Sequence, residues 1–546
     1  MRLSLPLIIF LPLLIAGLVF YPAISFDFTW LAHSHILERG VILDSWDQFF
    51  PTLFGNGKNS LGNFRPMYSF YQTLEFGLWG ENPSGHHASS LFLHFVNILL
   101  VTLVLKKIRL DNWQILGVVL IWSIIPVSVP AVALLVGKAQ LLSTAFILCA
   151  FLVSNGGHKF WHLFFYVLFS VLAVLTTEIA ISGVVLCALW AHGQKGEWKS
   201  YVWLSVIPAL VALTGYLYTV SSLSSITVNY GWRIATFPFV YASYFFESMP
   251  AIRLTISDAT WSVNTWEVGK IVYYFFLLLS SIILQILMWQ KIPATRIFIL
   301  IFNIYVMSVS QILPTDYFRA DRFLYVAAIG WIGMFWMTIL HFIKGVLWRS
   351  LILIIIAGYY FLNSQNHLSV FQDDRALSEH ILDHSPDNRE AHYQLGKDRL
   401  EEDNLSAALA HLTRAAYGDP YLFSHVDEKA ARFQLAKARM ATGEYHLALE
   451  LFKTIEGESE RFPKLDLYIG ICYKMTLQPE MAYEYLVKYQ KKYPDELEGM
   501  EKMAEIYIDL GQKNNAINEL NKILRLYPDH PNRQGISDAV NQLYNL

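Results

Sequence analysis

The sequence predicts an all-α protein with two parts, a polytopic membrane helical domain followed by an α-solenoid. Of the 546 residues, 54% are hydrophobic and only 16% are charged, against roughly 25% charged residues in soluble proteins. Long apolar runs fill residues 1–363, whereas residues 364–546 carry more charge and a repeating helical pattern. We therefore predict a transmembrane domain over residues 1–363 and a repeat domain over residues 364–546. The net charge of −3 gives no indication of a nucleic-acid partner.

About eleven apolar runs have a length typical of membrane-spanning helices. They lie near residues 5–22, 90–105, 113–132, 139–154, 159–176, 178–193, 201–220, 267–289, 296–313, 324–343 and 350–363. The segment 236–250 is an alternative further membrane or interfacial helix. The first run follows a short basic start but no clear cleavage site, so we interpret it as a retained span. Cleavage after Ala-Ile-Ser near residue 25 is the alternative.

Basic residues predict the orientation of these spans, because positive loops stay in the cytoplasm. Four basic clusters fall on one side of the predicted membrane: Lys106, Lys107 and Arg109; Lys195 and Lys199; Lys291 and Arg296; Lys344 and Arg349. The N-terminus is then cytoplasmic, and the loops 23–90, 221–266 and 314–323 lie outside with the repeats. We expect a multi-pass protein of a bacterial cytoplasmic (inner) membrane with periplasmic repeats. An endoplasmic-reticulum membrane with lumenal repeats is the alternative.

The C-terminal part contains four units with a period of about 34 residues, which resembles the tetratricopeptide repeat. Small residues recur where paired helices would cross closely, and a proline often follows the second helix. Such residues are Gly396, Ala408 and Pro420; Ala436, Gly443 and Ala448; Gly470, Ala482 and Pro494; Ala504, Gly511, Ala516 and Pro528. Residues 366–388 look like the second helix of a preceding half-repeat, and residues 531–546 like a capping helix. Such a solenoid commonly binds a protein partner, with a purely packing role as the alternative.

The predicted outer loop at residues 23–90 concentrates Asp, His, Arg and Trp between two spans. Connections are usually short, so a long loop of this composition suggests a functional region. A site in this loop could meet a lipid-borne substrate from the membrane and a protein from the water.

This loop and the repeats together resemble one family, the transmembrane and tetratricopeptide-repeat O-mannosyltransferases and their bacterial relatives. These enzymes belong to the GT-C class of membrane glycosyltransferases. The loop matches carry the pattern Arg-Pro, then Trp-Gly-x-Asn-Pro-x-Gly-x-His, then a helix with His: Arg65, Pro66, Trp79, Gly80, Asn82, Pro83, Gly85, His86 or His87, and His94. Three later stretches match in order: residues 131–146, residues 176–180 with Glu178, and residues 321–331 with Arg322. The resemblance implies a GT-C-like membrane fold.

The resemblance also implies a reaction: inverting transfer of a sugar from a polyprenyl-phosphate donor to a hydroxyl of a protein acceptor. Such a reaction needs a general base for the acceptor proton and positive charge for the departing phosphate. The partners would be a polyprenyl-phosphate lipid and a protein at the repeats. The sequence indicates no resident cofactor. A divalent metal ion is the less favoured alternative, because Asp27, His86, His87 and His94 have no compact ligand spacing.

The titratable part of the family pattern is largely missing from this chain. The usual Asp-Asp pair becomes Leu31-Ala32, and the His-Pro-x-His-Thr-Glu stretch becomes IPVSVP at residues 125–130. The Arg and Asp of the Gly-Arg-Ala-Asp stretch become Lys138 and Gln140. These losses favour a second interpretation, a catalytically degenerate scaffold whose repeats assemble a protein partner.

Asp27 is the predicted catalytic base, since it lies just after the first span and a short alignment gap places it at the family's acidic position. Asp44 and Asp47 are further candidates, with loop or helix-cap roles as the alternative for all three aspartates. Glu178 lies in or beside an apolar span, where a carboxylate is costly and therefore paired or functional.

Three basic residues are candidates for binding the donor phosphate. Arg322 can bind phosphate through two N–H groups, and Lys138 is a second member of the predicted phosphate clamp. Arg65 precedes a proline, so we expect it to organise the loop first and to bind phosphate second.

Overall fold

The computed structural model describes residues 4–29, 64–154, 160–192, 198–222, 236–256, 268–310, 319–418 and 426–545. Every regular element of any length within these ranges is a helix, which confirms the all-α prediction. Contacts divide the described chain into two units, one ending at Asn388 and one beginning at Arg389. This division lies later than the predicted boundary after residue 363. The last apolar helix continues past residue 363, and a further helix packs against the turn that follows it.

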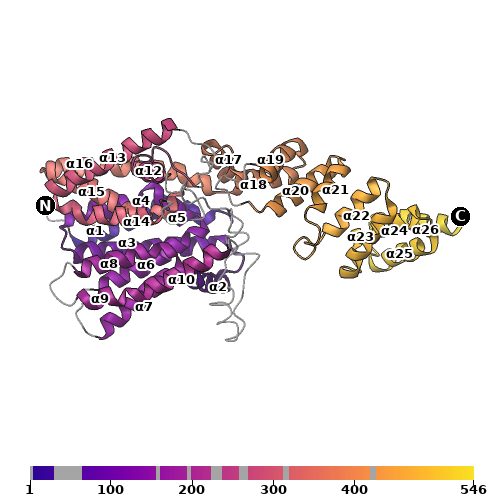
Figure 1. Cartoon of the computed structure of the whole chain (residues 1–546), viewed down its shortest axis with the longest axis horizontal. Coiled ribbons are helices and arrows are strands. Elements are labelled where there is room, and N and C mark those ends of the chain that lie inside the picture. Colours follow the sequence, from indigo (N-terminus) through magenta and orange to yellow (C-terminus); the bar gives the residue numbers. More distant parts are fainter. Residues whose placement is uncertain are drawn as a thin grey trace. The chain divides into compact units, whose positions relative to one another are not determined.

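The first unit contains sixteen labelled α-helices among its described residues (Figure 1). They are α1 (Leu5–Phe20), α2 (Pro66–Trp79), α3 (Pro83–Lys107), α4 (Asn112–Ile124), α5 (Val129–Ala133), α6 (Lys138–Val153), α7 (Phe160–Thr176), α8 (Ile181–His192), α9 (Trp198–Leu204), α10 (Val206–Ser222), α12 (Phe237–Ser243), α13 (Val268–Lys291), α14 (Arg296–Ser308), α15 (Ala327–Phe342), α16 (Val346–Leu368) and α17 (Asp374–His384).

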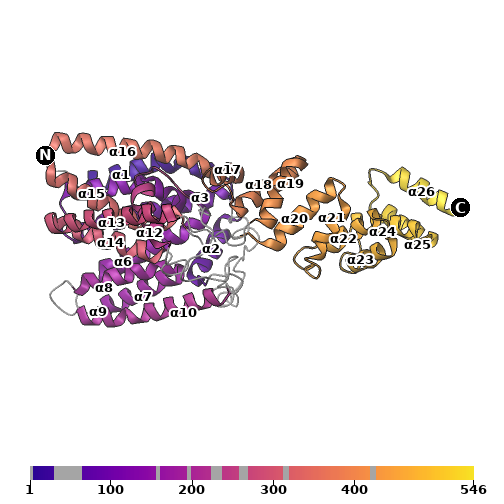
Figure 2. The same ribbon diagram turned by 45° about the horizontal axis from the view of Figure 1, so that its top comes forward.

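These helices form two groups that meet at α3 and α6. Figure 2 shows α7–α10 on one side of the unit and α13–α16 with α1 on the other. Helix α3 packs against α6, α1 against α4, and α4 against α15. Helices α14 and α15 approach each other closely at Gly330, where a Cβ would lie 2.4 Å from the Phe302 nitrogen. Backbone contact of this kind requires glycine.

The turn between α2 and α3 explains why the Trp-Gly-x-Asn-Pro-x-Gly motif has its composition. Gly80 ends α2 with a positive φ of 56°. The Asn82 side chain caps α3 by accepting a bond from the Ser84 N–H at 3.1 Å, and Pro83 begins the helix. A Cβ at Gly85 would lie 2.5 Å from the Trp79 ring. The motif therefore shapes a tight helix–turn–helix corner.

All eleven predicted spans coincide with apolar helices, but the number of membrane crossings is not confirmed. Among the described residues, six helices are long and apolar enough to cross a membrane. The predicted span at 113–132 is a pair bent by 55° between Ile124 and Pro126, which makes a seventh if it crosses as one. Four predicted spans are shorter apolar helices: Phe160–Thr176, Glu178–His192, Pro293–Ser308 and Ala327–Phe342.

The second unit confirms the predicted solenoid of paired helices. The pairs are α18 (Arg389–Glu401) with α19 (Leu405–Tyr417), α20 (Glu428–Ala441) with α21 (Tyr445–Lys453), α22 (Leu465–Met475) with α23 (Pro479–Lys492) and α24 (Leu497–Asp509) with α25 (Lys513–Leu526). Helix α26 (Arg533–Asn545) packs on α25 as the predicted cap.

Within each pair, the small residues of the repeat face the partner helix. A Cβ at Gly396 would meet Leu412, and one at Gly470 would meet Leu486. The turn inside each pair contains one residue with positive φ: Asp403, Gly443, Leu477 and Gly511. Glycine adopts this conformation without steric cost, which explains its place in two of the four turns.

Candidate functional site

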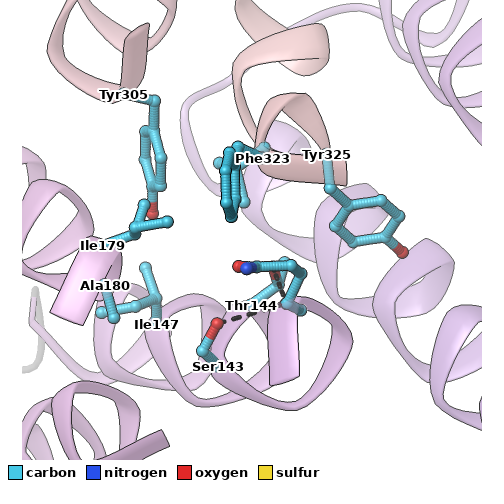
Figure 3. A pocket seen from close by; sticks show the side chains of 10 residues that line it. Ser143, Thr144, Ile147, Ile179, Ala180, Tyr305, Phe323 and Tyr325 are labelled. Atoms are coloured by element: carbon cyan, nitrogen blue, oxygen red, sulfur yellow. Dashed lines mark hydrogen bonds between the residues drawn. The ribbon is translucent and has the colours of Figure 1, made fainter. Parts of the chain in front are cut away.

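A small pocket in the first unit brings together three stretches that carry the family resemblance. Its lining comes from α6, from the turns Glu178–Ala180 and Asp321–Leu324, and from α14. The residues that matter here are Gln140, Ser143, Thr144, Ile179, Ala180 and Phe323. Figure 3 shows Phe323 between Tyr305 and Tyr325, with Ser143 and Thr144 across the pocket. About 10 Å³ is open to the centre of a water molecule, which is room for about one water. This pocket by itself is therefore smaller than a sugar.

The first-loop motif reaches the same pocket through His94. Its Nδ1 lies 2.7 Å from the Tyr325 hydroxyl and its Nε2 lies 3.0 Å from the Ser123 carbonyl oxygen. Because a carbonyl can only accept, Nε2 carries the proton and Nδ1 accepts from Tyr325. The pocket and the bond between His94 and Tyr325 thus bring all four stretches of the resemblance into one region of the unit.

Arg65 and Glu178 form a two-pronged ion pair beside this pocket. The Nε and Nη2 atoms of Arg65 donate to the two carboxylate oxygens of Glu178 at 3.1 and 2.7 Å. Arg65 precedes Pro66 at the start of α2, and Glu178 begins the turn that lines the pocket. The pair ties the start of α2 to the turn before α8.

Lys138 lies at the start of α6 and forms a buried ion pair with Glu75 of α2. Its Nζ lies 2.6 Å from Oε2 of Glu75, and the side chains are 1% and 4% exposed. His86 of α3 places Nδ1 3.2 Å from the same oxygen. Burial alone raises the pKa of Glu75, but the Lys138 ammonium and the bonds from His86 and Lys138 hold this pKa below its ordinary value.

The second nitrogen of His86 joins this cluster to the end of α2. Its Nε2 donates to the Gly80 carbonyl oxygen at 2.9 Å. This bond fixes the ring so that Nδ1 faces the Glu75 carboxylate.

Asp27 is exposed and lies close to this cluster. Its carboxylate accepts a bond from the Phe28 N–H at 2.7 Å, and its carbonyl oxygen lies 3.3 Å from Nε2 of His87. The neighbouring Phe28 is buried, with its ring 5.6 Å from the His86 ring. The buried neighbours of Asp27 thus anchor the chain, and the Asp27 carboxylate stays accessible.

Arg322 is 6% exposed and donates from Nη1 to the Ile256 carbonyl oxygen at 3.3 Å. Its guanidinium also lies over the Phe323 ring, 4.9 Å from the ring centre. Arg322 therefore lies next to the pocket, since Phe323 lines it.

Sequence reasoning missed two buried or partly buried carboxylates. Glu75 holds Lys138, and Glu247 accepts from Arg319 at 3.2 Å and from the Tyr274 hydroxyl at 3.0 Å. Each is a lone acidic residue in an aromatic, apolar segment, a pattern that could have identified it. Asp44 and Asp47 lie outside the described residues. Among the residues that are described, no group of three or more His, Cys, Asp or Glu side chains is arranged to hold a metal ion.

Comparisons with known proteins support the prediction at two points. A family model for the tetratricopeptide repeat matches residues 498–530, the fourth predicted unit. Over 133 residues the chain is 29% identical to the Protein O-mannosyl-transferase Tmtc1 of Drosophila melanogaster. This match covers 24% of the chain and 16% of the relative's length.

Two solved structures also show low-identity similarity. The P58(IPK) tetratricopeptide-repeat domain is 12% identical, with 75% of this chain and 98% of that chain covered and a TM-score of 0.20. The Cut9–Hcn1 hetero-tetramer of the APC/C is 11% identical, with 87% and 89% covered and a TM-score of 0.27. The chain thus combines tetratricopeptide repeats with apolar helices of membrane-spanning length, and a quarter of it is similar to an O-mannosyl-transferase.

Proposed function

We propose that this chain is a membrane glycosyltransferase of the GT-C class. It moves a sugar from a polyprenyl-phosphate donor to a protein acceptor held by the repeats. The observation that carries the proposal is the convergence of the four family-like stretches on one region, with the exposed carboxylate of Asp27 close by. The similarity to an O-mannosyl-transferase supports the reaction type. The inner membrane, with the repeats in the periplasm, is the proposed location.

In the proposed reaction, Asp27 removes the proton from an acceptor hydroxyl as its oxygen attacks the anomeric carbon of the sugar. The bond between this carbon and the phosphate oxygen breaks, and polyprenyl phosphate leaves with the bonding electron pair. The proton remains on Asp27 until water takes it. Attack from the face opposite the phosphate inverts the anomeric centre.

Arg322 is the proposed contact for the leaving phosphate, because a guanidinium stabilises the charge that develops there. Lys138 is already paired with Glu75, so we assign it to positioning α2 against α6. Arg65 is likewise paired with Glu178, and we assign it to organising the loop.

A scaffold without catalytic activity is the second candidate. It is favoured by the replacement of family carboxylates with Leu31, Ala32 and Gln140, and by the ion pairs that neutralise Lys138 and Arg65. In this alternative the first unit, called the membrane unit below, anchors the repeats, and the repeats assemble a protein partner.

The test compares wild-type protein with Asp27→Asn in liposomes that contain polyprenyl-phosphate mannose with a radioactive sugar. Transfer of label to added periplasmic proteins is measured. We expect Asp27→Asn to lower the rate by at least about 100-fold, the contribution of a general base. Glu81→Gln is the matched control, because Glu81 is an exposed carboxylate in the turn between α2 and α3, and it should keep the wild-type rate.

Undiminished transfer by Asp27→Asn would remove Asp27 from the mechanism. Wild-type protein that transfers no label but retains a bound protein partner would establish the scaffold instead.

A further inference from the structure

A hollow in the repeat unit combines an apolar lining with one cation. It has a volume of about 280 Å³ and lies between α18, α20, α21 and α22. Its main lining residues are Leu400, Lys437, Met440, Tyr445, Tyr468 and Ile471. The volume is close to the lower end of the range for small-ligand pockets, about 300–1,000 Å³. The hollow therefore suits one or two side chains of an extended segment.

Lys437 contributes the cation of this hollow, and its ammonium has no hydrogen-bond or ion-pair partner within the described part of the repeats. The side chain is half-buried. Burial lowers the pKa of Lys437, and the like charges of Lys397 and Lys464 lower it further, while Glu401 acts in the opposite direction. An anion placed here would relieve this repulsion.

Several other lysines of the repeats already have carboxylate partners about one repeat further along the chain. Lys464 lies 2.6 Å from Glu498, Lys429 pairs with Glu458, and Lys474 pairs with Glu505. Lys437 instead has apolar side chains around it, and its charged neighbours are Lys397, Lys464 and Glu401. Among the described residues, the repeat-to-repeat network thus leaves the Lys437 ammonium unpaired in an apolar hollow where three helix pairs meet.

We propose that this hollow binds an extended segment of a protein partner in which an acidic residue lies next to a large apolar residue. The carboxylate pairs with Lys437, and the apolar side chain fills the space between Met440 and Tyr468. Charge-assisted bonds of this kind are stronger than neutral ones, and the apolar contact adds burial. The inference rests on the proposed role of the repeats in holding a protein, but it does not require sugar transfer.

The test uses full-length protein in nanodiscs and three fluorescent six-residue peptides with blocked ends. Their sequences are Gly-Ser-Asp-Phe-Gly-Ser, the same with Asn for Asp, and the same with Ala for Phe. We expect the Asp-Phe peptide to bind at least about fivefold more tightly than either other peptide, a difference of about 1 kcal/mol. Lys437→Gln should remove this preference for Asp, and Lys437→Arg should keep it.

Lys491→Gln is the matched control, because Lys491 is exposed on α23 and carries the same charge. Equal affinity for all three peptides would overturn the proposal. So would an unchanged preference in Lys437→Gln, or an equal loss in Lys491→Gln, which would indicate general charge attraction. Because peptide binding is measured without donor lipid, a protein that binds the peptide but transfers no sugar would contradict only the proposed enzyme activity.

Discussion

The two units use charged side chains in opposite ways. In the membrane unit, ion pairs join residues far apart in sequence, 113 positions for Arg65 and Glu178 and 63 positions for Lys138 and Glu75, and the second pair is buried. In the repeat unit, pairs such as Lys464 with Glu498 span 34 positions and lie partly exposed. Ion pairs therefore fix the arrangement of distant helices in the membrane unit, whereas in the solenoid they stabilise the contact between neighbouring repeats.

Glycines also have different neighbours in the two units. Gly330 of the membrane unit lies against the backbone of α14, whereas Gly470 of the repeats lies against the flexible end of Leu486. A backbone cannot move aside as a side chain can, so equal substitutions should have unequal effects in the two units.

Removing the Lys138 charge should have the largest effect. Lys138→Met leaves the buried Glu75 without its strongest partner, and breaking a buried ion pair costs about 3–5 kcal/mol in free energy of unfolding. The measurement is the unfolding midpoint in detergent. The double variant Glu75→Leu with Lys138→Met removes both charges and should recover most of the loss. A double variant as unstable as the single one would mean that Lys138 acts through packing rather than charge.

Replacing Gly330 with alanine should lower the stability of the membrane unit by an intermediate amount, whereas the same change at Gly470 should affect the repeats little. Gly330→Ala places a Cβ 2.4 Å from the Phe302 nitrogen and 2.6 Å from the Phe298 carbonyl oxygen, and overpacking costs about 1–3 kcal/mol. In Gly470→Ala the new Cβ would lie 2.9 Å from Cγ of Leu486. The substitution also gains about 1 kcal/mol of helix propensity. It should therefore cost less than about 1 kcal/mol, the part of the overpacking that the gain in propensity does not offset. Thermal unfolding of both variants checks the contrast, and similar losses would contradict it.

Acid should produce the smallest effect, in the repeats. Bonds from Lys474 and Lys502 outweigh burial and hold the pKa of Glu505 below its ordinary value, which is about 4.3. Because the pKa is lower in the folded state, the ionised carboxylate stabilises the protein at pH values above its ordinary pKa. This stabilisation is lost as the pH falls through the folded-state pKa. Glu505→Gln should thus cost up to about 1 kcal/mol at pH 7, as for an exposed pair, and progressively less as the pH falls through the folded-state pKa.

Hydrogen exchange of α22 and α24 amides in the full-length chain measures this difference locally. Glu484→Gln is the control, because Glu484 is an exposed carboxylate of α23. A difference between Glu505→Gln and wild-type protein that does not shrink as the pH falls from 7 would contradict the assignment to the ion pair.

Much of the fold could be predicted because local periodicity encodes it. The spacing of Gly396, Gly470 and Ala504 predicts helix pairs that cross closely, and the pairs form as expected. Apolar runs likewise locate the membrane helices. The number of crossings could not be predicted, because several apolar helices are short, and residues 113–132 contain a 55° bend.

The candidate site was predictable only in its individual residues. Glu178 was identified as a carboxylate in or beside an apolar span, and Arg65 and Lys138 through the family resemblance. Their pairing depends on contacts between helices distant in sequence, which no local pattern contains. Glu75 could have been noticed as a lone carboxylate in an apolar segment, but its pairing with Lys138 of another helix could not.

The contact between Glu75 and Lys138 also constrains the order of synthesis and assembly. Helix α2 leaves the ribosome well before α6, so Glu75 has no cationic partner from α6 until residue 138 has been made. A bare carboxylate is poorly tolerated in an apolar environment. We therefore expect α2 to reach its final place only after α6 has been made. The N-terminal half of the membrane unit would then be completed as a group of helices and not one helix at a time.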